Sequence, residues 1–578
     1  MTHAAQTLAE LLAERAAGMP DALALGFLHD EQCQTLSYAA LAMRAAGIAR
    51  LLREHGCAPG DRVLLLVPPG LDYVAAFFGC LFASAIAVPS YPPRGGRALH
   101  KVGHVLLDSA ARLVLLPKAL DGELLRAALS AERTPLFIED ADSLASVPLP
   151  DVDPESPAFL QYTSGSTSLP KGVMLSHRAV LANLAQIAQA FEHSASSVGV
   201  NWLPPFHDMG LIGTILQPIF VGFPSYLMSP LAFVQRPARW LKAIGRYGAT
   251  TVGAPNFAYE LCAERVSDGD LAAIDLSSVR VLFCGAEPIR TDTLQRFQQR
   301  FASRGLDPRA FFPCYGLAES TLFVSGVERG RGFRTRTPSG GARAYVACGS
   351  PRAGTRLRIV DPERCTALPD GQIGEVWVHG ASVASGYWEK PAASAATFGA
   401  TLVDEPGECW LRTGDLAFIA EGELHPTGRL KNLIIVAGRK LASEELEHTA
   451  LAAVGCGADR AAVAFAAAAD SGGTEAVALI IELADLADDG SALAACEAWA
   501  RCICDALGRE QDVALAELHL VRRGELLRTT SGKVERAANH AAVAAASLSI
   551  AASWRAGHWT FHAGGFGPKP AARKDAVP

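Results

Sequence analysis

The chain lacks the charge balance and the cysteine pattern of several large protein classes. Its 578 residues carry 52 basic and 59 acidic side chains, a net charge of −7, so no general attraction to nucleic acid or to an anionic membrane surface is expected. The 13 cysteines include no C-x-x-C pair, the nearest two being Cys502 and Cys504, and no His/Cys group has zinc spacing. Dispersed thiols are typical of a reducing compartment, so we expect a cytoplasmic protein. The acidic net charge predicts no nucleic-acid partner.

We expect neither export nor a membrane span. Residues 1–25 hold acidic side chains and an amphipathic pattern, unlike the basic stretch and apolar core of a signal peptide. Two uncharged stretches, Tyr73–Pro93 and Leu211–Val234, are long enough to span a bilayer. Prolines interrupt both, so we predict buried helix, strand and turns there and no membrane span; a spanning helix is the alternative.

Three familiar motifs are absent. A Walker A loop counted from Gly165 has Pro170 at its second glycine and Gly172 where a Ser or Thr belongs. The hydrolase elbow G-x-S-x-G is approached only at 380–384, where Ala384 replaces the last glycine. No G-x-D-S-L serine of the kind that carries phosphopantetheine occurs either.

What the chain does have is a hydroxyl-rich loop. The stretch YTSGSTSLPKGVMLSH (162–177) gathers Ser/Thr hydroxyls and a glycine before Lys171. Loop amides, hydroxyls and an ammonium group all donate to phosphate oxygens, which predicts an anion cradle. A solvated linker is the alternative, but residues 157–163 are typical of a strand and residues 177–191 of a helix, so the loop joins two ordered elements.

The apolar pattern indicates at least two domains. Apolar runs alternate with helix-like segments along most of the chain, as in an α/β fold with a largely parallel sheet covered on both faces. From about 347 to 418, short strands with tight turns predict an antiparallel or barrel-like subdomain. Strands and a helix after a joint near 428–432 predict a small α+β domain. Residues 548–578, rich in Gly, Pro and Ala, are expected to form a flexible tail.

Six further stretches follow the loop in a fixed order: NWLPPFHDMG (201–210), CGAEPIR (284–290), CYGLAES (314–320), LRTGDL (411–416), GRLKNLIIVAGR (428–439) and RTTSGKVER (528–536). Over about residues 8–540 the chain resembles the adenylate-forming superfamily of acyl-CoA synthetases, nonribosomal peptide adenylation domains and luciferases. PPFHDMGLIG is most similar to fatty acyl-AMP ligases. The resemblance implies a large N-terminal domain (1–429) of parallel sheets in αβαβα layers with a barrel-like subdomain (347–428), then a small mobile α+β domain (430–547).

The implied reaction is attack of a fatty-acid carboxylate on the α-phosphorus of ATP, giving an acyl-adenylate and pyrophosphate. Two unit anions about 4 Å apart repel by roughly 4 kcal/mol at an effective dielectric near 20, so such a site needs cations. Lys533 in TTSGKVE resembles the mobile catalytic lysine of the family. The acyl group would then pass to the phosphopantetheine thiol of a separate acyl carrier protein that loads a polyketide or nonribosomal peptide synthase.

The resemblance also assigns a nucleotide and metal site. Glu319 would bind Mg²⁺, Tyr315 would stack on adenine, and Asp415 would accept hydrogen bonds from the ribose. Lys171 and the loop would hold the β- and γ-phosphates. The expected ATP-binding residues are Thr163, Ser164, Gly165, Ser166, Thr167, Lys171, Gly285, Ala286, Glu287, Tyr315, Gly316, Asp415 and Arg429.

The FHDMG stretch allows two interpretations. His207 and Asp208 suggest a metal-binding pair, but no further ligands follow at suitable spacing. The resemblance instead makes His207 a catalytic gate where the acyl carboxylate enters. The expected acyl pocket consists of His207, Met209, Gly210, Ile212 and Gly213, and the expected hinge of Lys431 and Asn432.

Three features depart from the fatty acyl-AMP ligases. The interval 327–347 is Arg-rich and shorter than the insertion that is thought to disfavour coenzyme A in that family. Asn432 stands where the hinge usually has Asp, and LASEELE (441–447) lacks a common tyrosine-proline pair. An acyl-CoA synthetase with the same first step is therefore one alternative, and a non-catalytic lipid- or nucleotide-binding relative is another.

Overall fold

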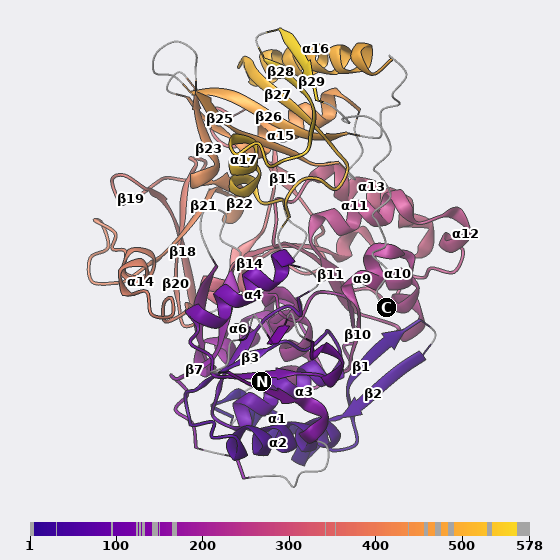
Figure 1. Ribbon diagram of the computed structural model, residues 1–578, viewed down its shortest axis with the longest axis vertical. Coiled ribbons are helices and arrows are strands. Elements are labelled where there is room, and N and C mark those ends of the chain that lie inside the picture. Colours follow the sequence, from indigo (N-terminus) through magenta and orange to yellow (C-terminus); the bar gives the residue numbers. More distant parts are fainter. Residues whose placement is uncertain are drawn as a thin grey trace. The chain divides into compact units, whose positions relative to one another are not determined.

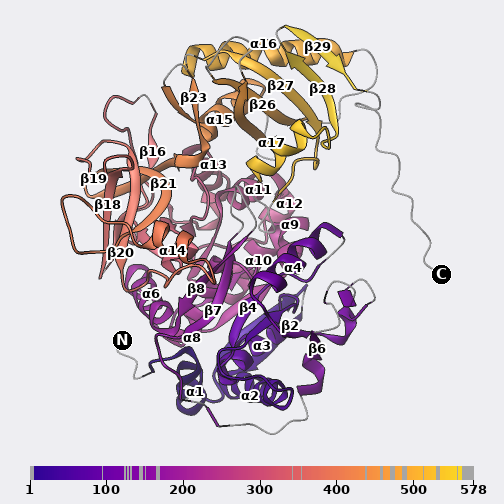
Figure 2. The ribbon, with the colours of Figure 1, turned by 60° about the vertical axis from the view of Figure 1, so that its left-hand side comes forward.

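The structure, a computed structural model, describes residues 5–30, 32–93, 96–122, 125–126, 129, 133–141, 148–149, 151–163, 170–341, 343–352, 354–436, 439–455, 460–468, 475–483, 491–511, 513–528, 534–555 and 557–562. The chain divides between Thr427 and Gly428 into two compact units, called the large unit and the small unit below. Both are drawn in Figures 1 and 2.

A nine-stranded sheet forms one layer of the large unit. Its order is β17-β14-β13-β12-β11-β9-β10-β1-β2. The strands are β1 (Leu23–His29), β2 (Gln32–Ser37), β9 (Gly199–Asn201), β10 (Ser225–Met228), β11 (Thr251–Ala254), β12 (Val281–Cys284), β13 (Phe311–Gly316), β14 (Phe323–Gly326) and β17 (Ser350–Pro351). The inner strands pair in parallel, and the antiparallel pairs lie at the two edges. The predicted parallel α/β body is confirmed.

A second, six-stranded sheet has the order β6-β5-β3-β4-β7-β8. Its strands are β3 (Arg62–Leu65), β4 (Ile86–Pro89), β5 (Leu113–Leu116), β6 (Thr134–Phe137), β7 (Pro157–Thr163) and β8 (Lys171–Ser176). β8 runs antiparallel to β7, whereas the other pairs are parallel. Val63 and Leu65 of β3 join one apolar core and Leu64 joins another, so the continuous apolar run follows from burial of both faces.

Helices cover these two sheets, except α14, which packs against β21 (Leu411–Ala420) of a third sheet. They are α1 (Leu8–Gly18), α2 (Tyr38–Glu54), α3 (Leu71–Phe82), α4 (Gly96–Asp108), α6 (His177–Phe191), α7 (Asp208–Leu211), α8 (Gln217–Val221), α9 (Pro230–Gln235), α10 (Ala238–Tyr247), α11 (Asn256–Arg265), α12 (Asp268–Leu271), α13 (Thr291–Phe301) and α14 (Pro391–Phe398). Figures 1 and 2 both show α1, α2 and α3 side by side. None of the helices in the described ranges combines the length and apolar character that crossing a membrane requires.

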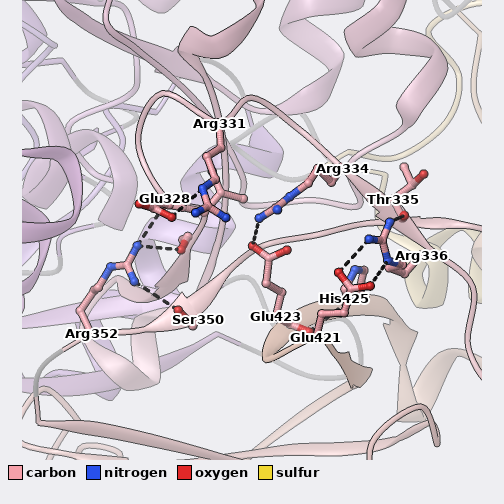
Figure 3. Close-up of polar contacts among 12 residues, drawn as sticks. Glu328, Arg331, Arg334, Thr335, Arg336, Ser350, Arg352, Glu421, Glu423 and His425 are labelled. Atoms are coloured by element: carbon pink, nitrogen blue, oxygen red, sulfur yellow. Dashed lines mark hydrogen bonds and ion pairs between the residues drawn. The ribbon is translucent and has the colours of Figure 1, made fainter.

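A five-stranded antiparallel sheet occupies the interval predicted to be barrel-like. Its strands, in spatial order, are β19 (Thr366–Ala367), β18 (Thr355–Asp361), β20 (Gly374–Gly380), β21 (Leu411–Ala420) and β22 (Glu423–Arg429). The Arg-rich interval 327–347 is tied to the turn between β21 and β22. Arg334 pairs with Glu423 at 2.7 Å, and Arg336 donates twice to Glu421, at 2.7 and 3.1 Å (Figure 3).

The small unit is a sheet with helices on both faces. Its strands are β25 (Ala462–Ala468), β26 (Glu475–Leu483), β27 (Leu515–Arg522), β28 (Ile550–Arg555) and β29 (His558–Phe561), and its helices are α15 (Ser443–Ala453), α16 (Ser491–Gln511) and α17 (Arg536–Ala544); β23 (Leu433–Val436) and β24 (Arg439–Ala442) form a hairpin. Leu479 and Ile481 pack toward α15 and α16, and Ile480 packs toward α17. This alternation is the period of two that a sheet covered on both faces requires.

The prediction of a flexible tail over 548–578 is wrong for its first part. β28 pairs with β27 and β29 pairs with β28, so these strands complete the five-stranded sheet. Ala551 and Ala552 are buried, and Trp554 and Trp559 pack against the core formed with α16. The Gly- and Ala-rich composition hid an alternating strand pattern.

Candidate active site

The predicted phosphate loop begins and ends on a β-hairpin. Thr163 closes β7, Lys171 opens β8, and the two residues are paired in register. The body of β7 is buried, because its apolar residues Phe159 and Leu160 enter different cores on the two faces of the sheet. Both ends of the loop are therefore fixed by regular pairing. Residues 164–167 lie outside the described residues, so their phosphate contacts stay a prediction.

Side chains from two other segments anchor the base of this hairpin. The Tyr162 hydroxyl donates to Asp108 at 2.9 Å, and Lys390 also donates to Asp108. Burial and the Asp108 carboxylate raise the pKa of Tyr162, so the phenol stays a neutral donor. On the other side, His104 Nε2 donates to the Pro170 carbonyl at 3.1 Å. Both stems of the hairpin are thus hydrogen-bonded to α4, and Lys390, just before α14, holds the Asp108 carboxylate in place.

Glu319 lies at the tip of a second hairpin, formed by β13 and β14. Thr321 has φ 67° and ψ −66°, and Leu322 N donates to Ser320 O at 2.8 Å, which together define a γ-turn. The Thr321 hydroxyl fastens this turn to the Ser382 carbonyl at 2.7 Å. Such strained turns persist only where the surrounding structure holds them, and they cluster at functional sites.

A chain of contacts joins Lys171 to Glu319. The Lys171 ammonium lies 4.8 Å from the centre of the Tyr387 ring, within cation–π range. The hydroxyl of the same tyrosine donates to Glu319 Oε1 at 2.9 Å. The structure therefore brings together the predicted phosphate-binding lysine and the predicted magnesium ligand, through a residue that the sequence did not single out.

Tyr315 and Asp415 also meet. The Tyr315 hydroxyl donates to Asp415 Oδ2 at 2.8 Å, and both residues are buried. Asp415 follows Gly414, whose φ is +69°, at an irregularity in the β20–β21 pairing. Such a bulge redirects the next side chain. Buried Glu375 stabilises it by accepting from Gly414 N at 3.1 Å.

The Gly285–Ala286–Glu287 turn follows the carboxyl end of β12. Ala286 has φ +66°, and a Cβ on Gly285 would lie 3.0 Å from the Cys314 carbonyl, so the turn approaches β13 closely. Glu287 Oε1 accepts from Phe257 N at 2.6 Å, at the start of α11. This carboxylate therefore positions the turn, and the predicted path of the adenine along the backbone is compatible with that role.

His207 precedes the first turn of α7. Its Nδ1 lies 2.6 Å from Asp208 Oδ1, while Met209 N is 2.6 Å from the same oxygen and 3.3 Å from Nδ1. The Met209 amide donates to both acceptors, so both side chains cap the first turn of α7. Nδ1 is therefore engaged at the start of the helix, and Nε2 is the ring nitrogen that makes none of these contacts.

The predicted acyl pocket lies on a helix with an irregular middle turn. A π-helical turn, η3 (Ile212–Leu216), separates α7 from α8. Met209 and Ile212 are buried in the main core, and a Cβ on Gly210 would lie 2.0 Å from the Pro204 carbonyl. Gly213 instead faces Leu322, next to the γ-turn after Glu319. π-turns inside α-helices are frequent at functional sites.

The hinge residues lie at the start of the small unit. Lys431 and Asn432 end the short helix η7 (Leu430–Asn432). Asn432 donates to Glu444 Oε1 at 2.7 Å, in the first turn of α15. Arg429 also belongs to the small unit, so its place beside the ribose stays a prediction. Lys533 lies outside the described residues.

The residues present fit a magnesium–nucleotide complex better than a protein-held metal. Among the described residues no group of three or more His, Cys, Asp or Glu side chains could hold an ion by itself. Mg²⁺ commonly takes one or two carboxylates, water and substrate phosphates. Glu319 accepts a hydrogen bond from Tyr387 and is joined through it to Lys171, so it would be one such carboxylate.

Sequence reasoning missed three residues of the site: Asp108, Tyr387 and Lys390. Their partners lie far away in sequence, 68 residues for Tyr387 and Glu319 and 282 residues for Lys390 and Asp108. The one available signal was ASGYWEKP (384–391), where large aromatics stand in a turn-like segment before a helix-starting proline.

Comparison with known proteins shows the family of the chain. Residues 12–388 match the family model "AMP-binding enzyme". The chain is 38% identical over 564 residues to the putative fatty-acid–CoA ligase FadD21 of Mycobacterium tuberculosis, covering 91% of this chain and 96% of the relative. It is 38% identical over 576 residues to the long-chain-fatty-acid–AMP ligase FadD26 of Mycobacterium marinum, covering 92% and 96%. The crystal structure of a fatty acyl-adenylate ligase from Legionella pneumophila, in complex with acyl adenylate and pyrophosphate, aligns with a TM-score of 0.72 at 33% identity, covering 96% and 98%.

Proposed function

Because the chain belongs to the AMP-binding enzyme family, we propose that it is a fatty acyl-AMP ligase that loads a separate acyl carrier protein. In the first step a fatty-acid carboxylate oxygen bonds to the α-phosphorus of ATP, and the bond to pyrophosphate breaks. In the second step the phosphopantetheine thiol attacks the acyl carbonyl, and AMP leaves with the electron pair. The observation that carries the proposal is the convergence of the Lys171–Tyr387–Glu319 chain and the Tyr315–Asp415 pair in a chain that has the family's ordered motifs.

The large unit would bind and orient ATP. Lys171 and Thr163 stand at the two stems of the loop and would hold the β- and γ-phosphates. Tyr315 would present its ring to adenine, and Asp415 would accept the ribose hydroxyls. Glu319 would hold Mg²⁺, which supplies charge neutralisation at the phosphate oxygens when bound.

His207 and Lys533 would act on the substrate carboxylate. Contacts at Nδ1 hold the His207 ring at the start of α7, so Nε2 would meet the acid at the entrance of the acyl pocket. Lys533, carried by the small unit, would neutralise the negative charge that builds up as carboxylate and phosphate approach. Met209, Gly210, Ile212 and Gly213 would form the wall of the pocket.

Two acceptors for the acyl group remain in competition. The relative named as a fatty-acid–AMP ligase supports a carrier protein, and the one named as a fatty-acid–CoA ligase supports coenzyme A. Ion pairs tie the interval 327–347 to the β21–β22 turn, but this interval is shorter than the insertion expected of fatty acyl-AMP ligases, so the acceptor is decided by the assay below.

The test supplies the enzyme with ATP, Mg²⁺ and a long-chain fatty acid, and then with either coenzyme A or a phosphopantetheinylated acyl carrier protein. Mass spectrometry of the products is expected to show acyl-adenylate in both reactions and thioester only on the carrier protein. Efficient acyl-CoA formation would replace this proposal by an acyl-CoA synthetase. Failure to exchange pyrophosphate into ATP in the presence of any fatty acid would indicate a non-catalytic relative.

A further inference from the structure

Tyr387 is held between two segments that are distant in sequence. Ala384 N donates to the Glu319 carbonyl at 2.9 Å, which ties residues 384–388 to the β13–β14 tip. The same residues run along β8: Met174 N donates to Gly386 O at 2.9 Å, and Trp388 N donates to Gly172 O at 2.8 Å. The backbone at position 387 is therefore fixed relative to both the phosphate hairpin and the Glu319 turn.

The side chain of Tyr387 is fixed as well. It is buried, its amide donates to Ser394 Oγ at 2.8 Å, and its ring packs edge-on against Phe398 at 5.2 Å. From this position its two chemical functions are used at once, the ring by Lys171 and the hydroxyl by Glu319.

We propose that Tyr387 is a positioning residue, which sets Glu319 for the metal ion and Lys171 for the triphosphate of the same bound nucleotide. The inference rests on the proposed function, because it takes Glu319 as the metal ligand and Lys171 as a phosphate ligand. A hydrogen bond to one carboxylate oxygen fixes the rotation of the carboxylate, which is how groups behind a metal ligand control its affinity. The ring restrains the long lysine side chain while leaving its N–H groups able to donate to phosphate.

The chemistry of tyrosine suits both tasks. The phenol of tyrosine ordinarily stays protonated at neutral pH, and here it donates to Glu319 Oε1. Phenylalanine in the same place would keep the ring below Lys171 and remove only the donor. Leucine would remove both. The two functions can therefore be separated by substitution.

The test measures binding without turnover. Mn²⁺ replaces Mg²⁺ as a paramagnetic probe, α,β-methylene-ATP replaces ATP, and bound Mn²⁺ is followed by electron paramagnetic resonance on the full chain. Tyr387→Phe is expected to weaken Mn²⁺ binding about 10-fold, the usual effect of losing a hydrogen bond behind a metal ligand, with little change in nucleotide affinity at saturating Mn²⁺. Tyr387→Leu is expected to weaken nucleotide binding as well, by roughly 3- to 10-fold.

Tyr259→Phe is the matched control. Tyr259 is fully buried and its hydroxyl donates to the Phe283 carbonyl, so the variant loses a comparable hydrogen bond away from Lys171 and Glu319. It is expected to melt at a lower temperature and to bind Mn²⁺ like the parent. A double variant tests the coupling between the two residues. Adding Tyr387→Phe to Glu319→Gln should cost no further Mn²⁺ affinity, because the carboxylate that Tyr387 positions is already lost.

Several results would overturn the inference. Parent-like Mn²⁺ binding by Tyr387→Phe, or full additivity with Glu319→Gln, would do so. If Tyr387→Phe does not fold, a double-mutant cycle of Lys171→Met and Glu319→Gln replaces it. The two substitutions are expected to be coupled by about 3-fold or more in nucleotide affinity, and additive effects would contradict the inference. A parent enzyme that binds Mn²⁺ and nucleotide without forming adenylate would refute the proposed function and leave the positioning result intact; no nucleotide binding would refute both.

Discussion

Replacing Asp415 by asparagine should lower kcat/KM for ATP, because Asp415 is proposed to accept hydrogen bonds from the ribose hydroxyls. Asp415 is only 7% exposed and accepts the Tyr315 hydroxyl at 2.8 Å, so little water screens its charge. Asparagine keeps one acceptor oxygen, which can retain the tyrosine, but puts an amide N–H₂ group where the second carboxylate oxygen stood. Hydrogen bonds to a charged group contribute about 1.5–3 kcal/mol, which corresponds to a loss of roughly 10- to 150-fold in kcat/KM for ATP.

The assay compares ATP with its 2′-deoxy and 3′-deoxy analogues in fatty-acid-dependent adenylate formation. The loss caused by Asp415→Asn should shrink for the analogue that lacks the contacted hydroxyl, because that contact is already missing. Tyr315→Phe serves as the control: it removes the phenol donor and keeps the ring, so a loss below roughly 5-fold is expected. Equal losses for ATP and both analogues would refute the ribose role of Asp415.

Three other substitutions test separate parts of the account. Lys533→Ala should lower the rate of adenylate formation by about 100-fold or more while ATP binding, measured by calorimetry, persists; an unchanged rate would remove Lys533 from the mechanism. Gly316→Ala should destabilise the large unit by about 1–3 kcal/mol in urea unfolding, because the added Cβ would lie 1.6 Å from the Leu322 carbonyl; a parent-like midpoint would contradict the geometry. Burial lowers the pKa of His177 from 6.5 to about 4, so the unfolded chain takes up a proton that the folded chain resists, and stability is lost as the pH falls through this range. At a pH of about 5 the loss should be about 2 kcal/mol, and His177→Gln should reduce it; the same pH dependence in the variant would exclude His177 as its source.

Local sequence signals predicted much of the large unit. The strand expected at 157–163 and the helix expected at 177–191 have the predicted bounds, because an apolar run and a helical period both stand between clear turn residues. The kinship with fatty acyl-AMP ligases and the ligase class are confirmed. The strands β28 and β29 were missed, because Ala- and Gly-rich composition masks alternation and their pairing depends on β27.

The site could be predicted only as far as its motifs reach. Tyr315 and Asp415 each stand in a recognisable stretch, and the structure joins them by a direct hydrogen bond. Tyr387 stands in no such motif. Its position depends on long-range pairing, namely the isolated antiparallel β-bridge to Val173 and the hydrogen bond from Ala384 N to the Glu319 carbonyl. The π-turn at 212–216 was equally hidden, since helix periodicity does not distinguish one widened turn.

The most direct test of the central claim is the exchange of radiolabelled pyrophosphate into ATP, with and without a fatty acid. We expect exchange that depends strictly on the acid and on Mg²⁺ and that is lost in Lys533→Ala. Exchange without any acid, or no exchange with acids of every chain length, would contradict the account.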